Sequence, residues 1–124
     1  MRQCSLEQRR LAIELIKELR SGKHQQGYGQ LVTDDHKYCC LGIAGKILGY
    51  TDAEMREMVT RVPTPSIDVE SVTTTTNRSG TLLSKEAAAR YGFTLEEMLE
   101  LARINDDGNS FHHIADKING MFNS

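Results

Sequence analysis

Several features that would place this sequence in a familiar class are scarce or missing. Its 124 residues include three cysteines and two prolines, and the apolar runs are short. Without a long apolar run, the chain has no segment able to cross a bilayer as a helix. The N-terminal stretch also lacks the continuous apolar region and the small-residue cleavage site of a secretory signal. We therefore expect a cytoplasmic protein that does not enter a membrane.

The cysteines are too few and too unevenly spaced for a disulfide framework. Cys4 stands alone, and Cys39 and Cys40 are neighbours in the sequence. Neighbouring cysteines can pair with each other only through a distorted peptide geometry. We therefore expect reduced thiols.

Basic residues are not in excess either. Lysine and arginine total 15 against 17 acidic residues, which gives a formal net charge of −2. Affinity for nucleic acid rests on clustered Lys and Arg side chains that neutralise phosphates. The composition therefore argues against a DNA-binding protein, although it is compatible with a local anion pocket.

The sequence does contain helical apolar periodicity, which is clearest at both ends. Its length suits one domain, residues 1–124, with a single core. Ser or Thr residues that can cap a helix precede several of the periodic segments. Helices are predicted over 5–20, 40–48, 51–61, 84–91, 94–104 and 110–121. We expect the first, fifth and sixth of these helices to build the core.

Two further segments carry turn and strand signals. Asp34-Asp35 can turn the chain between 30–33 and 36–39, which predicts a small β-hairpin that ends at the paired cysteines. Segment 62–81 holds both prolines and four consecutive threonines, so it is predicted to be a loop or a pair of irregular strands. The predicted fold class is α+β, a mainly helical single domain with a small β-hairpin.

Two motifs carry a family resemblance. YCCLG at Tyr38 to Gly42 and INDDGNSFHHIADKI at Ile104 to Ile118 are similar to motifs of a group of small, mostly uncharacterised phage and bacterial proteins. That group also has a Ser-Gly-x-x-x-Gln stretch after its first helix. The matching positions are Ser21, Gly22, Gln26, Tyr38, Cys39, Cys40, Leu41, Gly42, Asn105, Asp106, Gly108, Ser110, Phe111, Ile114, Ala115, Asp116 and Ile118.

The chain departs from the pattern of this group at His24, where Tyr is usual, and at Ile43-Ala44, where Val-Leu is usual. The resemblance brings no established activity. It implies a phage or prophage accessory protein that acts stoichiometrically, either by sequestering a host signalling nucleotide or by occluding a host protein.

The paired cysteines allow a catalytic, a metal-binding and a structural interpretation. A thiol at a helix N-terminus has a lowered pKa, and His36, His112 or His113 could complete a Cys–His pair. The histidines and cysteines lack the spacing by which one element presents two metal ligands, so no metal is predicted. Because free cysteines are often buried, we expect Cys39 and Cys40 to form a strand-to-helix joint, with a Cys/His-dependent hydrolase or transferase as the alternative.

The glycine-rich stretch 22–30 is the segment best suited to recognition. Its glycines let backbone amides approach a ligand, and its Lys, Gln and Tyr residues offer a cation, donors and a stacking ring. The C-terminal turn could close such a pocket. The predicted ligand-binding residues are Lys23, Gln26, Tyr28, Tyr38, Asn105, Asp106 and Ser110.

Together these features favour a non-enzymatic protein that binds a small, nucleotide-like ligand without a cofactor, since no set of nucleophile, base and orienting group can be assembled. A protein-binding inhibitor of a host protein is the near alternative. It would differ by an exposed apolar patch or an open strand edge in a hairpin. A homodimer is compatible with both functions.

Overall fold

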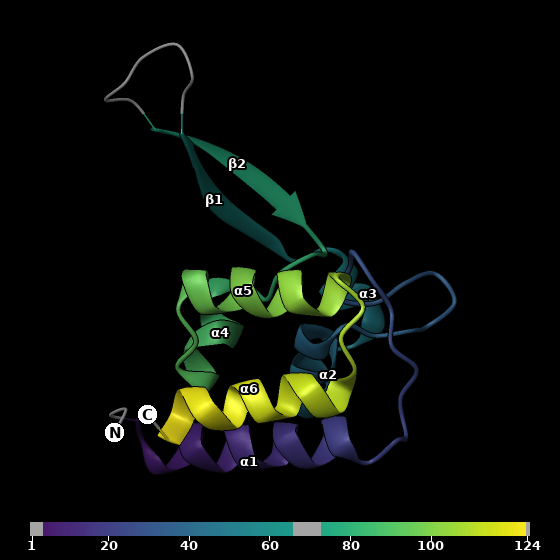
Figure 1. Cartoon of the computed structure of the whole chain (residues 1–124). Coiled ribbons are helices and arrows are strands. Elements are labelled where there is room, and N and C mark those ends of the chain that lie inside the picture. Colours follow the sequence, from purple (N-terminus) through teal and green to yellow (C-terminus); the bar gives the residue numbers. More distant parts are fainter. Residues whose placement is uncertain (1–3, 66–72, 124) are drawn as a thin grey trace.

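A computed structural model describes residues 4–65 and 73–123 of the chain. Within these residues the fold is mainly helical, with six helices and one pair of antiparallel strands (Figure 1). The elements are α1 (Leu6–Arg20), α2 (Cys40–Ile47), α3 (Asp52–Arg56), β1 (Val59–Pro65), β2 (Thr73–Ser79), α4 (Lys85–Tyr91), α5 (Leu95–Asp106) and α6 (Phe111–Asn123). The predicted fold class is confirmed. None of the described helices is both long and apolar enough to span a membrane.

Local capping signals explain where the helices begin. In a capping box, a Ser or Thr hydroxyl and a Gln or Glu side chain three residues later satisfy each other's backbone N–H groups. Such boxes are formed by Ser5 and Gln8 at α1, by Thr51 and Glu54 at α3, and by Thr94 and Glu97 at α5. The prediction that the helix from residue 51 continues to 61 is wrong. It ends at Arg56, because Met58 accepts a hydrogen bond from Gly80 at the base of the hairpin.

Helices α1 and α6 lie side by side and antiparallel (Figure 1). Each turns an apolar stripe toward the core, and burial of a large aliphatic side chain contributes about 2 kcal/mol to stability. The buried residues are Leu11, Ala12, Leu15 and Leu19 of α1, and Phe111, Ile114, Ala115, Ile118 and Phe122 of α6. At the edge of the pair, Arg20 donates to Asp116.

Helix α2 contributes more to the core than the predicted set of three helices allows. All six residues from 40 to 45 are buried, and α2 packs against both α1 and α5. Its glycines permit this close approach. A Cβ at Gly42 would lie 1.9 Å from the Leu31 carbonyl oxygen, and one at Gly45 would lie 2.5 Å from Met55 Sδ. The short helix therefore sits in the centre of the domain because two of its positions carry no side chain.

The hairpin predicted over 30–39 forms only in part, as a turn with an antiparallel bridge and without regular strands. This segment makes isolated bridges, in which Tyr38 pairs with Val32 on one side and with Gln26 on the other. A tight turn closes between Thr33 and Lys37, with Thr33 N donating to Lys37 O at 2.8 Å. His36 adopts a left-handed φ of 59° in that turn. The turn forms where its local chemistry predicts it, but Tyr38 also pairs outside the turn and no regular ladder forms.

The regular hairpin lies instead in the segment predicted to be a loop or a pair of irregular strands. Strands β1 and β2 pair antiparallel from Val59 opposite Ser79 to Pro65 opposite Thr73. Residues 66–72 of that segment lie outside the described residues. The strands form no sheet with other described elements, and the hairpin extends away from the helices (Figure 1).

The two prolines fit this ladder because of their register. Gly80 N donates to Met58 O at 2.7 Å, so hydrogen-bonded pairs fall on the even-numbered residues of β1. In an antiparallel ladder the alternate residues point their N–H groups away from the partner strand. Pro63 and Pro65 occupy such alternate positions. Neither proline therefore removes a hydrogen bond between β1 and β2.

Candidate functional site

Cys39 and Cys40 lie where an extended segment becomes α2. Cys39 is the N-cap, and its Sγ accepts from Gly42 N at 3.4 Å, whereas Cys40 Sγ lies 3.7 Å from the Leu101 carbonyl oxygen. Burial raises the pKa of Cys39 to about 11, and burial raises the pKa of Cys40 well above its ordinary value. Because the thiolate is the reactive form, the geometry supports the structural joint and gives little support to a cysteine nucleophile.

Asn105 is fully buried and joins three segments of the chain. Its Nδ2 donates to Gly27 O at 2.9 Å and to Asp106 Oδ1 at 3.3 Å. Its Oδ1 accepts from Gln26 Nε2 at 3.0 Å and from Cys40 N at 3.3 Å. A carboxamide offers two donor protons and two lone pairs, so its hydrogen-bonding capacity is used up. We call these five residues the Asn105 junction.

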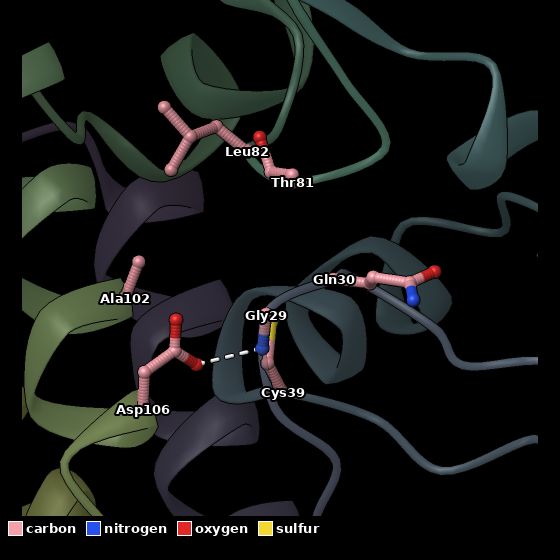
Figure 2. A pocket seen from close by; sticks show the side chains of 7 residues that line it. All are labelled: Gly29, Gln30, Cys39, Thr81, Leu82, Ala102 and Asp106. Carbon is pink, nitrogen blue, oxygen red and sulfur yellow. Dashed lines mark hydrogen bonds between the residues drawn. The ribbon is translucent and has the colours of Figure 1, made fainter.

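The rest of the junction is also satisfied internally. Gln26 Nε2 donates a second hydrogen bond to Asn109 O at 2.7 Å. Gly29 N donates to Asp106 Oδ1 at 2.8 Å, the bond drawn as a dashed line in Figure 2. This backbone amide of the glycine-rich stretch therefore binds a side chain of the same domain. The junction holds the stretch against α2 and α5, and it does not present these groups to a ligand.

A small cavity lies beside the junction (Figure 2). It is lined by Gly29, Gln30, Cys39, Thr81, Leu82, Ala102 and Asp106. Its volume is about 90 Å³, comparable with roughly three water molecules at about 30 Å³ each. Pockets for drug-sized ligands hold several hundred Å³. The cavity is therefore too small for a nucleotide.

Tyr38 belongs to a second, separate cluster centred on Asp52. The Tyr38 hydroxyl donates to Asp52 Oδ1 at 2.9 Å, and Lys46 Nζ lies 3.4 Å from that oxygen and 5.2 Å from the centre of the Tyr38 ring. His36 Nδ1 lies 2.7 Å from Asp52 Oδ2. Burial opposes ionisation of the carboxyl, but hydrogen bonds from His36, Tyr38 and Lys46 hold the pKa of Asp52 below its ordinary value. Asp52 is thus an ionised acceptor shared by three side chains.

His24, the position that departs from the pattern of the resembled group, stands beside this cluster. Its Nε2 lies 2.8 Å from Glu18 Oε2, and its ring meets the Tyr38 ring edge to face, with centroids 6.0 Å apart. The hydrogen bond with His24 lowers the pKa of Glu18. Among residues 4–65 and 73–123, no three His, Cys, Asp or Glu side chains are grouped to hold a metal ion.

The other three predicted site residues lie apart from both clusters. The Lys23 side chain is exposed, and its Nζ lies 3.8 Å from Glu18 Oε1. Tyr28 is half exposed. Ser110 Oγ accepts from His113 N and so caps α6. Of the seven residues predicted to share a ligand pocket, Gln26, Asn105 and Asp106 meet in one place. The seven residues do not line a common pocket.

A larger groove opens at the base of the hairpin, where the sequence indicated no site. Its volume is about 670 Å³, and it is lined by Val59, Thr60, Lys85, Glu86, Ala88, Ala89, Phe93, Leu95 and Met98. Phe93 and Met98 are buried beneath it, whereas Val59 is 51% exposed. One strand and two helices contribute most of these residues. No short motif could therefore have marked the groove in the sequence.

These features define a small, mainly helical domain with a buried polar junction and a projecting hairpin. The chain belongs to the family described as a domain of unknown function, DUF8296, whose model matches residues 8–122. This match confirms the expected membership of an uncharacterised family. No curated protein and no solved structure matches the chain significantly.

Proposed function

We propose that the chain is a non-enzymatic binding protein that holds an apolar segment of a partner protein in the groove between β1, α4 and α5. The observation that carries this proposal is the lining of the groove, in which six of the nine described residues are apolar. Val59, which is half exposed, and Phe93, which is buried, both line the groove. An exposed apolar surface with polar residues at its rim is typical of a protein interaction site.

The charges around the groove favour an apolar segment over a nucleotide. Among the described residues that line the groove, Lys85 and Glu86 are charged, and both are exposed. They carry opposite signs, so this described lining presents no cluster of cations to bind phosphates. Ala88 and Ala89 face the groove from α4 and leave room for side chains of a partner. Recognition of this kind uses apolar anchors of an amphipathic segment.

In the setting that the family resemblance implies, the partner would be a host protein. Binding in the groove would occlude a surface of that protein, which is the stoichiometric inhibition considered as the near alternative above. Cys39 and Cys40 are buried and their pKa values are raised, so neither thiol is well suited to act as a nucleophile. This is compatible with a protein that acts by binding.

Selection from a displayed library of random peptides tests this proposal. We expect selected peptides with apolar residues at helical or alternating spacing that bind the wild type. Ala89→Arg places a charged side chain in the groove and should abolish binding. Ala53→Arg is the matched control, because Ala53 is exposed on α3 outside the groove. Failure to select any peptide, or equal binding by both variants, would contradict the proposal.

A small apolar ligand is the second candidate, because the groove volume of about 670 Å³ falls within the usual range for ligand pockets. Mass spectrometry of molecules released by heating the purified protein distinguishes the two candidates. A compound released from the wild type and from Ala53→Arg, but not from Ala89→Arg, would favour the small ligand. A nucleotide-like compound in this experiment would restore the first prediction made from the sequence.

A further inference from the structure

The two outer edges of the hairpin differ in their ability to pair with another strand. On β1, the residues whose N–H groups point outward are Val59, Arg61, Pro63 and Pro65, by the register of the ladder. Two of these four positions are prolines, which have no N–H group. Proline at an edge strand is a common way in which proteins block further pairing. The outer edge of β1 is therefore closed over half its length.

The outer edge of β2 has no such block. Its outward positions are Thr73, Thr75, Asn77 and Ser79, and each has a backbone N–H and a C=O. In the described part of the chain, β2 pairs with β1 alone. The hairpin extends away from the helices, so they do not cover this edge (Figure 1). Strand β2 thus presents an open edge.

We propose that this edge pairs with β2 of a second copy of the chain, which forms a four-stranded antiparallel sheet across a two-fold axis at Thr76. This register places Thr73 opposite Ser79 and Thr75 opposite Asn77 of the second copy. It matches all outward N–H and C=O groups of the strand. The groove lies on the β1 side, so this inference goes beyond the proposed function and does not depend on it.

The sequence of β2 suits a second copy of the same strand. Residues 73–77 carry no charge, and the one charged residue of the strand, Arg78, would stand opposite Thr74 of the second copy. No like charges are therefore paired across the axis. The contact also closes on itself, because the two edges left at the outside of the sheet are the proline-containing ones. A dimer is the expected assembly, not a fibre.

Sedimentation equilibrium of the full chain with two proline variants tests the proposal. We expect the wild type to have twice the 13.9 kDa mass of one chain. Thr75→Pro removes an outward N–H from both copies and should weaken dimerisation about tenfold or more. Arg61→Pro places the same residue on the outer edge of β1 and should leave dimerisation unchanged. A monomeric wild type, or equal weakening by both variants, would overturn the proposal.

Disulfide trapping keeps the proposal testable if a proline variant fails to fold. Across the two-fold axis the two copies of Thr76 form a non-hydrogen-bonded pair, whose Cα atoms lie about 4.5 Å apart, a separation that a disulfide can bridge. In a Cys4→Ser background, we expect Thr76→Cys to form a covalent dimer on oxidation, visible on a non-reducing gel. Thr64→Cys, on β1, should stay monomeric on the same gel. Equal trapping of both variants, or of neither, would overturn the proposal.

Discussion

The Asn105 junction and the hairpin handle their polar groups in opposite ways. At the junction, a fully buried carboxamide bonds to four partners from three segments. In the hairpin, one outer edge is interrupted by prolines and the other exposes a row of backbone groups. The first arrangement specifies the fold and leaves little hydrogen-bonding capacity for a ligand. The second leaves outward backbone N–H and C=O groups that can form hydrogen bonds with a partner.

This difference indicates a structural role for the two motifs that carry the family resemblance. The residues of YCCLG and of the Asn-Asp turn are those that build the junction and the α2 joint. The groove and the open edge lie in 59–98, outside both motifs. A sequence signature can therefore describe the framework of a domain while the surfaces proposed here for interaction lie elsewhere.

The largest effect is expected at the centre of the junction. Asn105→Ala leaves Cys40 N and Gly27 O without their side-chain partner in the interior, and unsatisfied buried groups cost about 1 to 3 kcal/mol each. We expect the free energy of unfolding in urea to fall by about 3 kcal/mol. Asn119→Ala, at an exposed position of α6, is the control and should change stability by less than about 0.5 kcal/mol. Equal losses of stability from both substitutions would contradict the central role given to Asn105 in the junction.

A glycine pair provides the next test. A Cβ at Gly42 would lie 1.9 Å from the Leu31 carbonyl oxygen, so Gly42→Ala should destabilise the domain by about 2 kcal/mol. Gly120 lies in α6, and a Cβ added there would meet no atom within 4 Å. Gly120→Ala should therefore stabilise the domain by about 0.5 to 1 kcal/mol. Thermal unfolding of both variants measures whether each substitution raises or lowers the stability of the domain. A stable Gly42→Ala protein would show that α2 does not pack as described.

The Asp52 cluster should make a smaller contribution to the free energy of unfolding, and this contribution should depend on pH. The folded-state pKa of Asp52 is lowered below the ordinary 3.8, so its contribution is present above that pH and is lost as the pH falls through the folded-state pKa. Asp52→Asn should cost about 1 kcal/mol at pH 7, and the difference from wild type should shrink toward pH 3. Urea titrations at several pH values measure this. The same loss from Asp34→Asn, an exposed position, would contradict the assignment.

The smallest effect is expected at Cys39 and Cys40, where we predict no reaction with a thiol reagent. Burial holds the pKa of Cys39 at about 11, so its thiolate fraction near neutral pH is very small. We expect iodoacetamide to modify Cys4 in the folded protein at pH 7.5 and to leave Cys39 and Cys40 intact, as judged by peptide mass spectrometry. Rapid modification of Cys39 or Cys40 near pH 6 would instead support the Cys/His enzyme.

Sequence reasoning succeeds where the physics is local. The capping boxes at Ser5, Thr51 and Thr94 act over three residues, so the helix starts could be predicted. The strand pair in segment 62–81 could be predicted only as an alternative to a loop, because the fit of Pro63 depends on its register with Thr75. The burial of α2 could not be predicted, since Asn105 reaches Cys40 across 65 positions of sequence.

The candidate site illustrates the same limit. Gln26, Asn105 and Asp106 were predicted to line a ligand pocket, and they do lie together, although Gln26 and Asn105 are 79 positions apart in the sequence. Their polar groups bond within the domain, however, which the sequence alone does not reveal. The groove combines Val59 with residues of α4 and α5. Only the tertiary packing brings these positions together.

Amide hydrogen exchange, measured by NMR over a range of protein concentrations, tests the contrast between junction and hairpin most directly. We predict slow exchange at Gly27 and Cys40 at every concentration, because their N–H groups bond within the domain. Exchange at Thr75 and Asn77 should slow as the concentration rises, while exchange at Arg61 does not change. Rapid exchange at the junction, together with concentration-independent exchange along β2, would contradict the contrast.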